Sequence, residues 1–177
     1  MGSNGGSNGG SSGGSSGGSS GGSRQSERGE YTVTTTVLDA ETSRRLLGRA
    51  RFGRVGFTDD RGPHVLPVNC SVWHDEVVFR TEASSRLHEL GDGRSVAFEV
   101  DHLDPIREAG WSVVVRGAAR WIDDPVELDA VEELDLHPWA AGDHDRWIRI
   151  RADEVTGRMI ERHRTRLDSA SPYMPPD

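Results

Sequence analysis

Apolar and polar positions alternate on both sides of a short polar turn in the middle of the chain. The β-prone runs Val65–Val72 and Val77–Thr81 flank the segment Trp73–Glu76. Two such runs joined by so short a polar segment predict an antiparallel β-hairpin. Pro67, which has no backbone N–H, predicts a bulge or an edge position within the first run.

The same patterning predicts further strands and two or three short helices around this hairpin. Apolar alternation indicates strands at Phe52–Thr58, Ser95–Val100, Trp111–Ile122 and Arg146–Arg151, with Gly157–Ile160 as an extension of the last. Tyr31–Val37 is either a strand or an extended lead-in. Capping residues and composition predict helices at Leu38–Leu47 after Asp39, at Arg86–Leu90, and at Val126–Leu134 after Asp124-Pro125.

These elements amount to five to seven strands in meander or Greek-key order, with Asp101–Gly110 expected as a loop. The strands follow one another too closely for repeated βαβ units. A mainly β protein with a few short helices, built as an antiparallel barrel or half-open barrel, is therefore expected.

Composition divides the chain into three parts. Residues 1–23 are Gly, Ser and Asn after Met1, and they cannot bury enough apolar surface to offset the entropy of ordering. We expect residues 1–30 to be a disordered arm, either natural or an artificial linker. Residues 31–164 form the predicted domain, and 165–177, with three prolines, a loose tail.

The formal net charge of -8 argues against nucleic acid or an anionic membrane surface as a partner. No stretch of 18 apolar residues and no signal-peptide core are present, so a soluble, cytoplasmic protein is expected. Cys70 is the single cysteine, which excludes an intrachain disulfide; we expect it to be a buried structural thiol. The histidines form no metal-binding spacing, so no metal site is expected.

Candidate chemistry appears where the hairpin's second run leads into a helix. Arg80 and Thr81 end the run, and Ser84, Ser85 and Arg86 open the helical segment. Hydroxyls, backbone N–H groups and guanidinium groups are the donors that bind phosphate. The sequence therefore predicts a phosphate clamp between Arg80 and Arg86, although ordinary surface arginines are the alternative.

The order of segments resembles a known family. The series LLGRARFGRVGFT, HVLPVN, VVFRTEASSRL, SVAFEVD, GWSVVVRGAARWI and RWIRIRADEVTGRMI is similar to the pyridoxamine 5′-phosphate oxidase-like family, the FMN-binding split barrels, over residues 37–162. The resemblance implies that residues 31–164 form an antiparallel, FMN-binding split β-barrel. It also implies a homodimer with cofactor at the subunit interface.

The resemblance also assigns cofactor-binding residues by position. The residues implied to line the isoalloxazine edge are Val65, Leu66, Pro67, Val68 and Asn69. Those implied to hold the phosphate are Arg80, Thr81, Ser85 and Arg86. Those implied to reach the flavin elsewhere are Trp111 and Ser112, from the second subunit, and Arg158, near the ring. Core packing is an equal alternative for Trp111, and Trp139 is a candidate to cover the ring from a loop.

The chain differs from the family's vitamin oxidase at residues that bear on which substrate it could bind. The oxidase carries a Lys near Asn69, a second basic residue near Leu87, and a Trp where this chain has Thr156. Its Tyr/Arg/Ser set for the substrate phosphate has no clear match either. Activity on pyridoxamine phosphate is therefore not expected.

The function expected is that of an FMN-dependent oxidoreductase acting on an unidentified small molecule, with no catalytic residue identified. The cofactor would supply the electron chemistry. The alternative is a non-catalytic flavin-, F420- or haem-binding or sensing dimer, with His144 or His163 as candidates for haem. A structural barrel with a decayed pocket is the third possibility.

Overall fold

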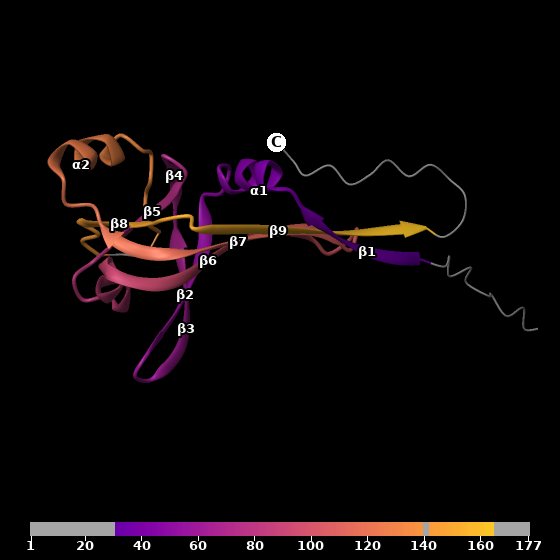
Figure 1. Cartoon of the computed structure of the whole chain (residues 1–177), viewed down its shortest axis with the longest axis horizontal. Coiled ribbons are helices and arrows are strands. Elements are labelled where there is room, and N and C mark those ends of the chain that lie inside the picture. The colour runs from indigo at the N-terminus through magenta and orange to yellow at the C-terminus, as the bar shows by residue number, and fades with distance from the viewer. Residues whose placement is uncertain (1–30, 140–141, 165–177) are drawn as a thin grey trace, which may run out of the picture.

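A computed structural model describes residues 31–139 and 142–164 (Figure 1). Within these ranges the chain forms nine strands, two α-helices and one short 3-10 helix, and every strand pair is antiparallel. The predicted fold class, a mainly β split barrel with few helices, is confirmed. The predicted arm, 1–30, and tail, 165–177, lie outside the described residues.

The elements follow in a simple order. They are β1 (Tyr31–Leu38), α1 (Ala40–Leu47), β2 (Phe52–Asp59), β3 (Gly62–Asn69), β4 (Ser71–Trp73), β5 (Glu76–Thr81), the 3-10 helix η1 (Arg86–Gly91), β6 (Asp92–Asp104), β7 (Ala109–Trp121), α2 (Pro125–Glu132), β8 (Arg146–Ile150) and β9 (Glu154–Arg164). Both predicted caps are present. Asp39 accepts a 2.7 Å hydrogen bond from the N–H of Thr42, and Asp124 accepts from Val126 and Glu127. No helix within the described ranges is long and apolar enough to cross a membrane.

Strand β7 is central to the sheet, whose main order is β3-β2-β6-β7-β8-β5-β4. One edge of β7 pairs with β6. Its other edge pairs with β9 over Gly110–Arg116 and with β8 over Ala119–Trp121. The two terminal strands of the order, β3 and β4, are consecutive in the chain and are separated by Cys70 alone. The barrel is therefore closed by the covalent chain at this point, while its strand ladder is split.

The predicted hairpin is shorter than expected, because Val65–Val72 is two strands rather than one. Strand β3 ends at Asn69 and pairs with β2, and the N–H of Cys70 donates to the carbonyl of Arg51. Only β4 pairs with β5. The turn between them contains His74 and Asp75 with φ of 50° and 62°, as a two-residue hairpin turn requires.

The strand count of five to seven was too low, because Val65–Val72 is two strands and Gly157–Ile160 belongs to a separate strand, β9, rather than to an extension of β8. Tyr31–Val37 is a true strand, since β1 pairs with β9 along its length. The expected loop Asp101–Gly110 is mostly strand, because β6 runs to Asp104 and β7 starts at Ala109. Together with β9 and the first residues of β7, including Trp111 and Ser112, these segments form an arm that extends away from the barrel (Figure 1). Their side chains are largely exposed, so they lack the apolar alternation by which a half-buried strand is recognised.

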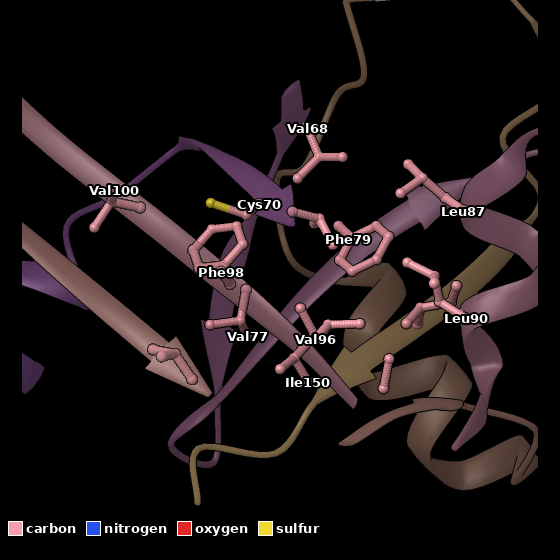
Figure 2. Close-up of a cluster of buried hydrophobic side chains, with 14 of the residues drawn as sticks. Val68, Cys70, Val77, Phe79, Leu87, Leu90, Val96, Phe98, Val100 and Ile150 are labelled. Atoms are coloured by element: carbon pink, nitrogen blue, oxygen red, sulfur yellow. The ribbon is translucent and has the colours of Figure 1, made fainter. Parts of the chain in front are cut away.

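The main core fills the barrel, as Figure 2 shows for residues from β3, β5, η1, β6 and β8. Phe79 and Phe98 are fully buried there, and Val68 and Leu87 are each 7% exposed. A second cluster lies beneath α2 and consists of Val78, Ile122, Val131, Leu136 and Trp147. Strand β5 therefore packs against the barrel core with Val77 and Phe79, and against the α2 side with Val78.

We predict that Gly117→Ala destabilises the fold by about 3 kcal/mol, the upper part of the usual range for overpacking. A methyl group at Gly117 would overlap the backbone carbonyl of Arg151, which cannot move without breaking the β7 pairing nearby. Gly56→Ala in β2 is the matched control, since its methyl group would lie 3.7 Å from the nearest atom. Urea unfolding of both variants measures the difference, and equal midpoints would contradict the prediction.

Candidate functional site

A cavity of about 270 Å³ lies where β3 passes the end of β5. Seven of the predicted cofactor-binding residues line it together: Leu66, Pro67, Val68, Asn69, Arg80, Thr81 and Ser85. The residues from the two halves of the prediction, the ring edge and the phosphate site, are thus brought into one place. Val65 is not part of this lining, and its side chain is exposed.

Strand β3 supplies one wall of the cavity. It pairs with β2 along one edge and ends the main strand order, so its other edge carries backbone groups that are not used in that ladder. Pro67 is tolerated in such a strand because a terminal strand can lack an N–H without losing a ladder bond. Backbone donors and acceptors are therefore available beside the cavity.

The end of β5 supplies the cationic wall. Side chains alternate along a strand, so Arg80 lies on the α2 side with Val78, and Thr81 lies on the barrel side with Phe79. The guanidinium carbon of Arg80 is 5.4 Å from the ring centroid of Trp147, and its buried Nε has no hydrogen-bond partner among the described residues. A buried donor of this kind calls for an acceptor that the described chain does not provide.

Two residues with hydroxyl groups, Thr81 and Ser85, line the same cavity as Arg80. Thr81 is only 1% exposed, and its hydroxyl makes one long contact of 3.4 Å with the carbonyl of Glu82. Ser85 caps η1 by accepting a 3.2 Å hydrogen bond from the N–H of Leu87, which leaves its hydroxyl proton free to be donated. Arg80, Thr81 and Ser85 together form a set of donors suited to an oxyanion.

Arg86 points elsewhere, toward the β2–β3 hairpin. Its Nη1 lies 3.3 Å from both ring nitrogens of His64, and such equal distances place the guanidinium over the imidazole face. The same Nη1 is 3.9 Å from the carboxylate of Asp59. A 2.8 Å hydrogen bond from His64 is the main cause that lowers the pKa of Asp59. Arg86 is not among the residues that line the cavity, and its contact with a phosphate stays a prediction.

Three further predicted residues also lie outside the cavity lining. Trp111 and Ser112 are on β7, and Arg158, on β9, is the register partner of Ser112. The indole Nε1 of Trp111 is buried and has no hydrogen-bond partner among the described residues. If these residues contact the same ligand, they would do so from a second copy of the chain.

Sequence reasoning missed three residues of the lining, Glu82, Leu87 and Pro138, and it named the further lining residue His144 only as a candidate for haem. Pro138 and His144 come from the segment between α2 and β8, which returns to β3. The backbone N–H of Trp139 donates a 3.0 Å hydrogen bond to Asn69 Oδ1, and the indole stacks on Phe52 with centroids 5.2 Å apart. Nothing local to this segment signals the return, since its partners lie about 70 residues earlier.

The cavity therefore has donors suited to an oxyanion at the end of β5 and the free backbone edge of β3 on its opposite wall. Within 31–139 and 142–164 no group of three His, Cys, Asp or Glu side chains is placed to hold a metal ion. An elongated, phosphorylated cofactor matches this donor set.

Comparisons with known proteins place these features in context. The sequence profile of the pyridoxamine 5′-phosphate oxidase family matches residues 39–159. The uncharacterized protein Rv0080 of Mycobacterium tuberculosis is 37% identical over 134 residues, which cover 72% of this chain and 88% of its own.

Solved structures agree with the family profile. The FAD binding protein from Mycobacterium smegmatis is 33% identical with a TM-score of 0.60, covering 70% of this chain and 98% of its own. The FAD and haem binding protein from the same organism has a TM-score of 0.54 at 16% identity, covering 81% of this chain and 89% of its own. The second likeness shows the fold alone.

We predict that Cys70, next to the cavity residue Asn69, is inert in the folded protein. The thiol is 2% exposed, and burial raises its pKa to about 12. An aromatic disulfide reagent at pH 8 should therefore label it only after urea unfolds the chain. Because the folded pKa exceeds the unfolded one, stability should also decrease as the pH rises from about 9 toward 12. Rapid labelling without urea would contradict this prediction.

Proposed function

Because this chain belongs to the pyridoxamine 5′-phosphate oxidase family, we propose that its cavity binds a flavin nucleotide, FMN, and that the protein is a flavin-dependent oxidoreductase. The observation that carries this proposal is the buried Nε of Arg80, which has no hydrogen-bond partner among the described residues. Thr81, which is 1% exposed, follows it in the chain. Both residues line a cavity whose other wall is a strand edge.

The residues of the cavity fit two parts of a flavin nucleotide, its phosphate and its ring. Arg80, Thr81 and Ser85 would bind its phosphate by charge-assisted hydrogen bonds. Backbone groups of Leu66–Asn69 would bind the polar edge of the ring. When bound, the flavin would supply the electron chemistry, and the chain would orient it. The M. smegmatis relative is described as binding FAD, which makes FAD the main alternative nucleotide.

We further propose a homodimer that completes this site. The cavity of about 270 Å³ is smaller than the roughly 300–1,000 Å³ of typical ligand pockets. The arm that carries Trp111, Ser112 and Arg158 also exposes a set of apolar side chains, namely Val33, Val37, Leu103, Ile106 and Ile160. An exposed apolar set of this kind is typical of an interface. A second copy covering it would bury these side chains and could bring the three predicted residues to the flavin.

The substrate proposed is a small molecule other than pyridoxamine phosphate, and the proposed location is cytoplasmic. Asn69 is neutral where the vitamin oxidase has a Lys. Leu87 is buried in the core, so its position supports the fold rather than a substrate phosphate. The cavity thus retains donors for one phosphate, which the cofactor would use.

We predict that Arg80→Ala weakens FMN binding by about 10- to 100-fold, as expected for loss of a charge-assisted hydrogen bond of ~1.5–3 kcal/mol. Quenching of flavin fluorescence during titration measures the dissociation constant. Arg44→Ala, at an exposed position on α1, should bind as the wild type does.

The variant Arg86→Ala tests whether the phosphate is bound by the cavity donors alone or by Arg80 and Arg86 together. If the cavity donors act alone, this variant should keep its FMN affinity. A loss equal to that of Arg80→Ala would restore the clamp of two guanidinium groups that the sequence suggested. A wild type that binds neither FMN nor FAD would remove the proposed function.

For the homodimer, we predict a wild-type mass in sedimentation equilibrium of twice that of one chain. Val37→Asp combined with Ile106→Asp should give monomers, because each places a carboxylate in the proposed apolar interface. Val126→Asp, exposed on α2 away from the arm, is the matched control and should remain dimeric. A monomeric wild type with full flavin affinity would contradict this part of the proposal.

A further inference from the structure

An aromatic shelf stands at the rim of the cavity and consists of Trp139 and Phe52. Their rings are 5.2 Å apart at an interplanar angle of 14°, so they are stacked. Phe52 is the register partner of Asn69, and Asn69 Oδ1 accepts the hydrogen bond from the N–H of Trp139. A single β2–β3 rung therefore fixes both the backbone and the ring of Trp139.

The shelf leaves one face of the indole open. Phe52 covers the other face, yet Trp139 is 78% exposed and Phe52 38% exposed. Packing alone would bury a Trp more fully, since burial of an indole is strongly favourable. The ring is instead held in a fixed orientation with an apolar, planar surface toward solvent.

Two residues next to the shelf belong to the cavity lining. Asn69, which anchors Trp139, lines the cavity, and so does Pro138, the residue before Trp139. Trp139 and Phe52 are not part of the lining themselves, so the shelf borders the cavity through Asn69 and Pro138. The lining residue at this rung, Asn69, is a neutral amide and carries no charge to pair with an ionised ring.

From this geometry we propose that Trp139 binds the ring of a planar, uncharged substrate, such as a quinone, by stacking at the mouth of the flavin site. The proposal rests on the proposed flavin function and deepens it by naming a substrate class. Trp139 is then a specificity-determining residue. Phe52 and Asn69 are positioning residues that hold its indole.

The test uses the full-length protein loaded with flavin and menadione, an uncharged naphthoquinone, as the probe in equilibrium dialysis. Trp139→Ala should weaken menadione binding about tenfold, within the range known for aromatic stacking. Trp139→Phe should retain most of the affinity, because it keeps an aromatic face. Val126→Ala, which removes an equally exposed apolar side chain on α2, is the control and should bind as the wild type does.

Further measurements distinguish the possible failures. Pyridoxamine 5′-phosphate should bind more weakly than menadione, and a tighter binding would overturn the substrate class. Equal menadione affinity in Trp139→Ala and wild type, with a lower thermal midpoint in the variant, would show that the indole only anchors its loop. Weaker FAD or FMN binding in Trp139→Ala would assign the shelf to the cofactor. In contrast, a wild type without affinity for either flavin overturns the underlying function itself.

Discussion

Strand β5 is covered on both faces, and this constraint positions the site. Val77 and Phe79 pack into the barrel, while Val78 packs under α2. A register shift by one residue would turn Val77 and Phe79 toward the α2 cluster and Val78 and Arg80 toward the barrel core. The places of Arg80 and Thr81 at its end are therefore fixed by the same packing that stabilises the fold. The Arg80 guanidinium, whose Nε has no partner among the described residues, therefore lies over the Trp147 ring at a place set by that packing.

The opposite wall depends on the junction at Cys70. Since β3 continues into β4 through this one residue, the β2–β3 pair lies beside the β4–β5 hairpin without a shared ladder. The split leaves an edge of β3 open beside the end of β5, and the cavity forms in that opening. The buried thiol of Cys70 contributes apolar packing at the junction. The fold thus creates a backbone edge and a cationic strand end next to each other.

Local patterns in the sequence were sufficient to predict the strands and helices that have one buried face. The alternation in Arg146–Ile150 and the caps at Asp39 and Asp124 predicted real elements. The arm escaped prediction because exposed strands lack that alternation, and β1 is a strand only through its pairing with β9. At the site, the run from Arg80 to Ser85 carried its own signal. The direction of Arg86 did not, since it depends on His64 and Asp59 in a hairpin about 20 residues earlier.

The segment between β7 and β8 connects these two walls and can be altered separately from them. Helix α2 packs on the second cluster, and the chain after it returns to Asn69 and Phe52. Arg80 and Thr81 belong to β5, whereas Trp139 is anchored by Asn69 on β3 and Phe52 on β2, so a change at the shelf leaves the β5 side chains in place. A split barrel of this kind can therefore keep one cofactor site while the α2–β8 segment changes the molecule admitted at its mouth. The exposed indole at that mouth is the feature by which this chain would select a planar ring.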